Sequence, residues 1–267
     1  MADKQEEMSF LDHLEELRWR VIYAFIAIII GAVVAFIAKS WVFDVVIFGP
    51  KSVDFVTYRW LCSFSQMLHL GDSFCFDSFD FVLQNISMSG QLSTHIMVSL
   101  IGGVIISFPF LITQVWLFLK PGLTKGEIKS TRGVVFFSSF LFAAGVLFGY
   151  YLIAPLSVLF LGGYQVSELV ANQINLNSFI TTVSSVTLAS GLIFQLPILI
   201  YFLAKLGFVT PELLKTYRKH ALVIVLVLSA IITPPDVMSQ ILVTIPVMFL
   251  YEISILIARR VIKNKAV

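Results

Sequence analysis

Four long stretches of this chain contain no charged residue, and they restrict its fold more than any other feature. They cover residues 21–38, 92–119, 133–161 and 179–204. Each is close to, or longer than, the roughly 20 apolar residues that a helix needs to cross a hydrocarbon core about 30 Å thick. Because lipid offers the backbone no hydrogen-bond partners, each stretch is predicted to be a membrane-spanning α-helix.

The composition agrees with a membrane protein. Of the 267 residues, 58% are hydrophobic and 13% are charged, and 25 are Phe. A soluble domain carries about a quarter charged residues. The net charge of +2 says little, because in a membrane protein the placement of charge matters more than its sum. No nucleic-acid partner is expected. The chain is therefore predicted to be an all-α integral membrane protein.

Two shorter apolar runs follow, at residues 221–232 and 237–251. At about 1.5 Å per residue they would reach only ~18 and ~22 Å as helices. The sequence "TPPD" lies between them, and its two prolines preclude one continuous helix. We therefore predict a hairpin of two short spans, which gives six transmembrane helices with the last two short.

The basic residues predict the orientation of these spans. With six spans, both termini and the loops 120–132 and 205–220 lie on one side of the membrane. That side holds all of the 18 Lys and Arg residues except Lys39, Lys51 and Arg59. Since cytosolic loops carry the excess of Lys and Arg, both termini are expected to be cytosolic.

This topology divides the chain into segments of one membrane domain covering residues 1–267. Residues 1–20 are expected to form a cytosolic amphipathic helix at the membrane interface that leads into the first span. Residues 258–267 form a cytosolic tail. On the outer side, residues 162–178 are expected to be a plain polar connection.

The other outer loop, residues 39–91, is long and aromatic, and we expect it to fold as an outer cap with short helices. It contains Cys62 and Cys75, the two cysteines of the chain, on the side away from the reducing cytosol. A disulfide is favoured, and two buried thiols packing as small apolar groups are the alternative. His69 and His95 show no spacing to these cysteines that would predict a metal site.

Motifs for catalysis and cofactor binding are missing from the sequence. It has no H-E-x-x-H, no phosphate-binding loop of the Walker type and no Gly-rich dinucleotide turn. Apart from Glu252 near the end of the last span, the predicted spans contain no Asp, Glu, Lys or Arg. Ionisable groups inside a membrane are typical of coupled carriers and proton relays, so neither an enzyme nor a classical coupled carrier is expected.

Two uncharged features inside the spans stand out. Gln195, in "FQLP", places an amide in the middle of a span. There it either hydrogen-bonds a neighbouring helix or contacts another subunit. Gly102 and Gly103 form an adjacent pair within a span.

Two acidic residues near the cytosolic face raise the question of function. Glu127 is a single carboxylate in a loop that also contains Lys120, Lys125, Lys129 and Arg132. Glu16 lies in "HLEELRWR", away from an apolar stripe and four residues before Arg20. An ion pair within the helix would account for Glu16 and contribute about 0.3–0.5 kcal/mol.

Four stretches resemble a known family. They are "HLEELRWR" (13–20), "QVWLFLKPGLTKGE" (114–127), "FQLP" (194–197) and "TPPDVMSQ" (233–240). In this order, over nearly the whole chain, they resemble TatC, the core subunit of the twin-arginine protein translocase. The chain departs from the family at Gln195, where an acid is frequent, and in its long outer loop with a cysteine pair.

The resemblance implies a receptor without catalysis or cofactor, in the bacterial inner membrane. TatC-like proteins bind signal peptides that carry two adjacent arginines, recruit the single-span subunits TatA and TatB, and export folded proteins with the proton-motive force. Self-association is expected too. The resemblance implies that Glu127 is the main contact for the arginines and that Glu16 assists. It also implicates Arg18, Pro50, Gln195 and Asp236, and we expect Leu17, Phe118 and Leu123 to form apolar walls. A small-solute permease is the alternative.

Overall fold

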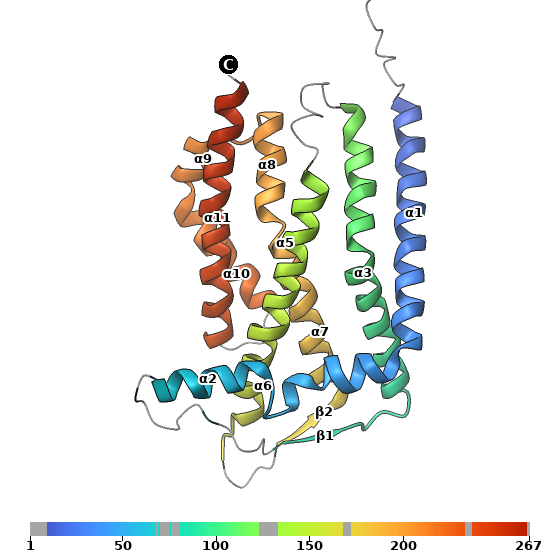
Figure 1. Cartoon of the computed structure of the whole chain (residues 1–267), viewed down its shortest axis with the longest axis vertical. Coiled ribbons are helices and arrows are strands. Elements are labelled where there is room, and N and C mark those ends of the chain that lie inside the picture. Colours follow the sequence, from blue (N-terminus) through green and yellow to red (C-terminus); the bar gives the residue numbers. More distant parts are fainter. Residues whose placement is uncertain are drawn as a thin grey trace, which may run out of the picture. The chain divides into compact units, whose positions relative to one another are not determined.

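The structure is a computed structural model that describes residues 10–67, 69, 75, 81–122, 133–167, 172–232 and 237–265. Within these residues it is predominantly α-helical (Figure 1). The helices are α1 (Phe10–Ile37), α2 (Val56–Met67), α3 (Gly90–Leu119), α5 (Val134–Phe148), α6 (Ala154–Gly163), α7 (Leu176–Ile193), α8 (Leu196–Leu206), α9 (Pro211–Thr216), α10 (Arg218–Ile232) and α11 (Val237–Lys265). Strands β1 (Val82–Gln84) and β2 (Gln173–Asn175) complete it, with π-helical segments Trp41–Ile47 and Gly149–Ile153 and 3₁₀ turns Gly49–Lys51 and Lys120–Gly122.

Five stretches of the described chain are long and apolar enough to cross a membrane. They are Leu11–Ile37, Gly90–Leu119, Val134–Gly163, Leu176–Leu206 and Gln240–Ile262. The prediction of an all-α membrane protein is confirmed. Helix α10 has 15 residues, so it is short, as the sequence predicted for the fifth span. The count of six spans stays a prediction.

The last span differs from the expectation. Helix α11 has 29 residues, and its apolar stretch Gln240–Ile262 has 23. The sequence placed its end near Tyr251 because Glu252 closes the charge-free run. In the structure Glu252 pairs with Arg218 at 2.6 Å and is 45% exposed, so the helix continues with its carboxylate at the surface. The prediction that the last span is short was wrong.

Helix α1 is one unbroken element of 28 residues. The expected amphipathic helix and the first span therefore share one helix axis from Phe10 onward. No Pro or Gly interrupts the sequence between residue 10 and Gly31, which is why the helix has no reason to bend where the charges end.

Contacts divide the chain into two compact units. The first comprises Met1–Ile37 and Ser99–Ser139, and the second comprises Ala38–Val98 and Phe140–Val267. In the first unit, α1 and α3 lie side by side (Figure 1). A Cβ added to Gly103 would lie 2.6 Å from both the Ala32 amide nitrogen and the Ile28 carbonyl oxygen. The two backbones therefore meet at a point where only glycine fits, as is common between membrane helices.

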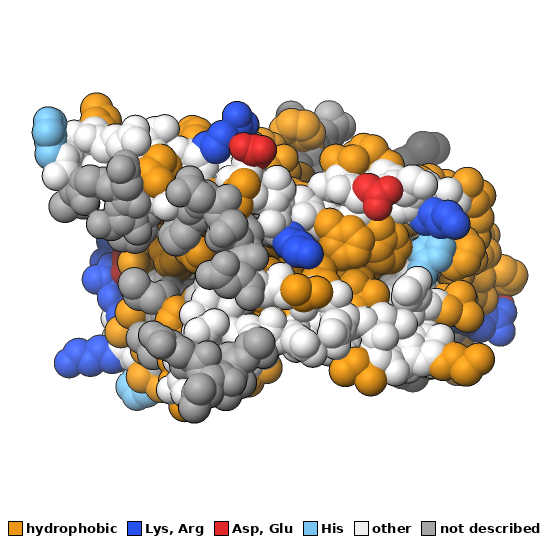
Figure 2. Space-filling model, turned by 90° about the horizontal axis from the view of Figure 1, so that it is seen from below, with side chains coloured by type: hydrophobic (Ala, Val, Ile, Leu, Met, Phe, Trp, Pro, Cys, Tyr) orange, Lys and Arg blue, Asp and Glu red, His pale blue; other side chains and the backbone are white. Residues whose placement is uncertain are grey.

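The second unit has a core beneath the predicted cap. Its buried members come from residues 41–51, from Phe81 just before β1, and from α3, α6 and α7: Ile47, Phe81, Val98, Ala154, Val158, Phe179, Ile180 and Val183. Helix α2 runs crosswise to α11 in Figure 1. Figure 2 views the face that carries α2, where apolar side chains are abundant and acidic and basic ones are sparse.

Tyr58 anchors α2 to this core. Its side chain is 2% exposed, and its hydroxyl lies 2.8 Å from the Pro50 carbonyl oxygen and 2.9 Å from that of Pro155. Burial raises the pKa of Tyr58 above the ordinary value of a tyrosine, because the charged phenolate would lose its water. Cys62, one turn further along α2, forms a disulfide with Cys75.

The connection after α6 is more than the plain loop expected from its polar sequence. Strand β2 pairs in parallel with β1, with Val82 opposite Gln173 and Gln84 opposite Asn175. Asn172 donates a hydrogen bond of 3.0 Å to the Gly162 carbonyl oxygen. The expectation of a plain connection was wrong, because three-residue strands carry too little pattern to be recognised.

Helices α7 and α8 form one candidate span with a break. The chain turns at residues 194–195, and Pro197, the second residue of α8, cannot donate to the preceding turn. Asn175 caps the start of α7 by accepting from the Asn177 amide. At the far end, α8 and α9 pack with α11 in a second core, where the Tyr251 hydroxyl donates to the Leu214 carbonyl oxygen at 2.7 Å.

Candidate functional site

The predicted site residues divide between the two units. Glu127, Leu123 and Asp236 lie outside the described residues. Glu16, Leu17, Arg18 and Phe118 belong to the first unit, and Pro50, Gln195, Cys62 and Cys75 belong to the second. The described part of the candidate peptide site is therefore the pair of helices α1 and α3.

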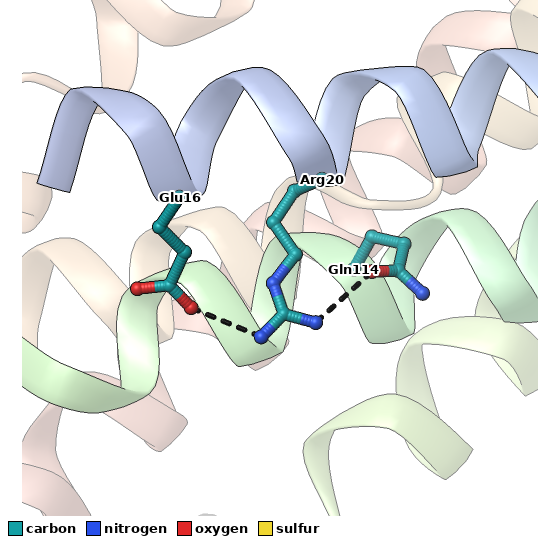
Figure 3. Close-up of polar contacts among 3 residues, drawn as sticks. All are labelled: Glu16, Arg20 and Gln114. Carbon is teal, nitrogen blue, oxygen red and sulfur yellow. Dashed lines mark hydrogen bonds and ion pairs between the residues drawn. The ribbon is translucent and has the colours of Figure 1, made fainter. Parts of the chain in front are cut away.

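A guanidinium is held between these two helices. Arg20 Nη2 on α1 donates to Glu16 Oε1 at 2.9 Å, one helical turn earlier. Arg20 Nη1 donates to Gln114 Oε1 on α3 at 3.3 Å. Figure 3 shows the guanidinium lying between the carboxylate and the amide. The ion pair within the helix, which the sequence offered as the simplest explanation of Glu16, is present.

This pair is more sheltered than its neighbour on α1. The side chains of Arg20 and Glu16 are 27% and 20% exposed, whereas those of Arg18 and Glu15 are 62% and 64% exposed although they also pair, at 3.1 Å. Shielding from water strengthens a charge interaction and penalises an unpaired carboxylate. A guanidinium is therefore expected to interact more strongly with Glu16 than with the exposed Glu15.

An aromatic contact also joins α1 to α3 near the Glu16–Arg20 pair. The rings of His13 and Phe118 stack with centroids 4.4 Å apart and an angle of 18°. His13, Glu16 and Arg20 are spaced by three and four residues, so they share the face of α1 toward α3. Leu17 is 37% exposed and Leu14 is 45% exposed, so they remain available as an apolar surface.

Sequence reasoning missed Gln114 and His13. Gln114 is 7% exposed and follows a long run of uncharged residues, so a polar side chain at this depth was the available signal. Its partner Arg20 is 94 residues away in the sequence, and no local pattern connects them. His13 opens the motif "HLEELRWR", but its contact is likewise on α3.

Pro50 and Gln195 have definite places in the second unit. Pro50 is fully buried, and its carbonyl oxygen lies within hydrogen-bond distance of Tyr58. Gln195 is the residue before α8, and its carbonyl oxygen accepts from the amides of Ile198 and Leu199 at 3.0 Å each. Gln195 therefore lies at the break between α7 and α8.

The fold defines a multi-pass membrane protein whose described polar site holds a guanidinium between two helices. Comparison with known proteins gives the family. The family model described as Sec-independent protein translocase protein (TatC) matches residues 12–246. The chain belongs to the TatC family.

Curated relatives match over almost the full length. The TatC protein of Blattabacterium sp. subsp. Periplaneta americana (strain BPLAN) is 38% identical over 266 residues, which are 99% of this chain and 100% of the relative. The TatCy protein of Bacillus subtilis (strain 168) is 32% identical over 256 residues, which are 96% and 91% of the two chains.

Solved structures agree. A crystal structure of the twin arginine translocase receptor TatC in DDM superimposes with a TM-score of 0.72 at 34% identity, covering 91% of this chain and 98% of that chain. A second crystal structure of that receptor gives a TM-score of 0.69 at 32% identity, covering 93% of this chain and 99% of that chain. The protein is thus a translocase component, a transport protein, and a solute permease is not favoured.

Proposed function

We propose that this protein is the receptor subunit of a twin-arginine translocase and binds twin-arginine signal peptides at its cytosolic face. Glu127 is the principal acceptor for the two arginines and Glu16 the second. Arg18 is assigned to the same site, and Leu17, Phe118 and Leu123 are assigned to contact the apolar part of the peptide. The relatives whose crystal structures match are described as twin arginine translocase receptors, which supports this role.

The observation that carries the proposal is the guanidinium already bound at Glu16. A sheltered carboxylate and an amide oxygen hold Arg20 from two sides. Carboxylates match the forked geometry of guanidinium and not the point charge of an ammonium. The same surface of α1 and α3 is therefore suited to select arginine over lysine.

Glu16 can accept a ligand arginine without losing Arg20 completely. An ionised carboxylate has two oxygens with about four acceptor sites, and Arg20 uses Oε1. An incoming guanidinium shares the carboxylate or replaces Arg20. The ligand arginine then competes with a partner from the same helix, which keeps the contact reversible.

Charge alone does not give useful affinity. An exposed ion pair contributes about 0–1 kcal/mol, whereas micromolar binding needs about −8 kcal/mol. The remainder has to come from apolar contact, and exposed Leu14 and Leu17 provide part of it beside Phe118. This requirement matches a ligand with an apolar segment next to its arginines.

The wider role of the subunit follows the family. It lies in the bacterial inner membrane, recruits TatA-like and TatB-like single-span subunits and associates with itself. With these subunits it exports folded proteins across that membrane, using the proton-motive force. Pro50, Gln195 and Asp236 are assigned to partner recruitment and translocation, and Pro50, which is fully buried, acts by fixing its segment. The excess of Lys and Arg in the loops 120–132 and 205–220 supports cytosolic termini.

The proposal is tested by peptide binding to detergent-solubilised protein. A twin-arginine peptide is compared with its Lys-Lys counterpart, by pull-down and titration. We expect Glu127→Ala to abolish binding of the twin-arginine peptide and Glu16→Ala to weaken it about tenfold, the order of one charge-assisted contact. Glu15→Ala is the matched control, because Glu15 is exposed and pairs with Arg18.

Equal binding of the two peptides would exclude a twin-arginine receptor. If Glu15→Ala weakens binding as much as Glu16→Ala, the effect is a general loss of negative charge, and the assigned role of Glu16 is wrong.

A further inference from the structure

A cavity of about 620 Å³ opens in the second unit, beside the N-terminal ends of α3 and α7. Its lining combines charged and polar side chains with apolar ones. The first group includes Lys39, Asp44 and His95, and the second includes Phe43, Phe48 and Ile180. None of these residues belongs to the proposed peptide site, so the cavity needs an explanation of its own.

The charged side chains of the cavity are of opposite sign. Among the residues that the structure describes, neither Lys39 nor Asp44 takes part in an ion pair. His95 meets the edge of the Phe43 ring with centroids 5.4 Å apart. Figure 2 shows basic, acidic and His side chains gathered around an apolar surface on this face. Both residues are exposed, and a ligand that carries both charges would pair with Lys39 and Asp44 together.

The apolar wall is part of the core of this unit. Ile180 has no exposed surface, and the Phe48 ring stacks on Phe179 with centroids 6.2 Å apart. Phe43, Phe48 and Leu176 pack against the buried core residues. The wall is therefore fixed in shape and offers a hydrocarbon chain a preformed surface.

The cavity lies where candidate spans begin and end. Lys39 comes two residues after the end of α1 at Ile37, Gln91 is the second residue of α3, and Leu176 is the first residue of α7. We assign these helix ends to the boundary between hydrocarbon and headgroups. A molecule with a polar head and an apolar tail meets the cavity at this level, whereas a soluble solute would leave the apolar wall uncovered.

We propose that this cavity binds a zwitterionic phospholipid with a primary ammonium group, such as phosphatidylethanolamine. Lys39 and His95 face the phosphate, Asp44 accepts from the ammonium, and one acyl chain lies against Phe43, Phe48 and Leu176. An anionic lipid leaves Asp44 without a cation, and a trimethylated headgroup cannot donate to it. The site therefore selects by headgroup charge and by hydrogen bonding.

Lipid titration followed by native mass spectrometry tests this in the full-length, delipidated protein. Phosphatidylethanolamine, phosphatidylglycerol and phosphatidylcholine with identical acyl chains are added separately. We expect the first to bind about fivefold more tightly than the other two, as one partly exposed charge contact allows. We expect Asp44→Asn to remove the preference for phosphatidylethanolamine and Lys39→Gln to weaken the binding of all three lipids.

Matched controls come from the same segment of the chain. Asp54→Asn and Lys51→Gln change the same residue types outside the cavity lining and should leave the preference unchanged. The comparison of headgroups on unaltered protein needs no substitution, so a variant that fails to fold does not spoil the test.

Three results would overturn the proposal. One is equal binding of the three lipids, and another is a preference that survives Asp44→Asn. The third is competition by soluble glycerophosphoethanolamine at the concentration at which the lipid binds, which would identify a soluble ligand. Each can occur whether or not the protein binds twin-arginine peptides.

Discussion

Helices α1 and α3 meet through backbone atoms, a few polar side chains and one stacked ring pair, whereas the described part of residues 39–91 is held by a disulfide, rings packed on a core and a buried hydroxyl. At Gly103 the two helix backbones touch, and near their other ends Arg20 connects Glu16 to Gln114. In residues 39–91, Tyr58 reaches two backbone carbonyl oxygens and Cys62 is bonded to Cys75.

The difference separates exchangeable contacts from permanent ones. In the apolar 18-residue window of α1, 17% of residues are buried, against 39% in the equivalent window of Val134–Gly163, so α1 depends on few contacts. Hydrogen bonds and ion pairs at a sheltered surface can be replaced by equivalent groups of a ligand. Buried rings and a disulfide offer no such substitution. Under the proposed function, peptide recognition is expected at the α1–α3 pair, and the described part of residues 39–91 is suited to a fixed structural role.

The largest effect is expected where the two helix backbones touch. Gly103→Val places a branched side chain against the Ala32 and Ile28 backbone atoms, which cannot move aside as a flexible side chain can. We expect the free energy of unfolding to fall by about 3 kcal/mol or more, and peptide binding and export to be lost with it. Thermal unfolding in detergent and the peptide titration measure both.

Gly163→Val is the matched control, because an added Cβ at Gly163 has nothing within 4 Å. If Gly103→Val binds peptide with unaltered affinity, the pairing of α1 and α3 is not needed for the site. Peptide recognition would then not depend on the contact between α1 and α3.

The sequence predicts the helices well because charge-free length is a local property. It also singled out Gly102 and Gly103, and it favoured the disulfide from the position of two cysteines in one loop. It failed at α11, because the arginine that pairs with Glu252 is 34 residues away. It failed again at β1 and β2, whose pairing joins three-residue strands from two distant loops.

For the candidate site, the same limit applies. Glu16 and its pair with Arg20 follow from spacing along one helix, and that geometry is present. The contributions of Gln114 and His13 depend on which faces of α1 and α3 meet. Packing between helices decides this, and the chain's periodicity alone does not encode it.

The next largest effect is expected from the disulfide. The two cysteines are 13 residues apart, and closing a loop of this size contributes at most about 3 kcal/mol in the chain-entropy model. Cys62→Ser with Cys75→Ser should lower the unfolding temperature and leave the peptide affinity unchanged. Thiol labelling of unreduced, denatured protein should find no reactive cysteine. Two labelled thiols, or a loss of peptide binding in the double variant, would contradict the permanent role of this region.

A moderate effect is expected at Tyr58 in alkali. Because burial raises its pKa, the folded state favours the neutral phenol. The stability from this group is fully present below the ordinary tyrosine pKa of about 10 and is lost as the pH rises from there toward the folded value. Tyr58→Phe removes the hydroxyl, whose one proton is shared between the Pro50 and Pro155 carbonyl oxygens, which costs about 1–2 kcal/mol at neutral pH.

The measurement is thermal unfolding between pH 7 and about 10.5. The difference between the unaltered protein and Tyr58→Phe should narrow as the pH rises. Tyr164→Phe is the control, since Tyr164 is 63% exposed. A difference that stays constant over this pH range would show that ionisation of Tyr58 does not limit stability.

The smallest effect is expected from removing the resident guanidinium. Arg20→Gln frees Glu16 from a partner one helical turn away, in a pair that contributes about 0.3–0.5 kcal/mol when exposed and somewhat more when sheltered. If ligand arginine competes with Arg20, the affinity for a twin-arginine peptide should rise about twofold to fivefold.

Arg18→Gln breaks the exposed pair with Glu15 and should not raise affinity. The double variant Glu16→Ala, Arg20→Gln should show no gain over Glu16→Ala, because the gain acts through Glu16. A fall in affinity on Arg20→Gln would reverse the interpretation: Arg20 would then hold Glu16 in position, and the α1–α3 contacts would be as permanent as those of residues 39–91.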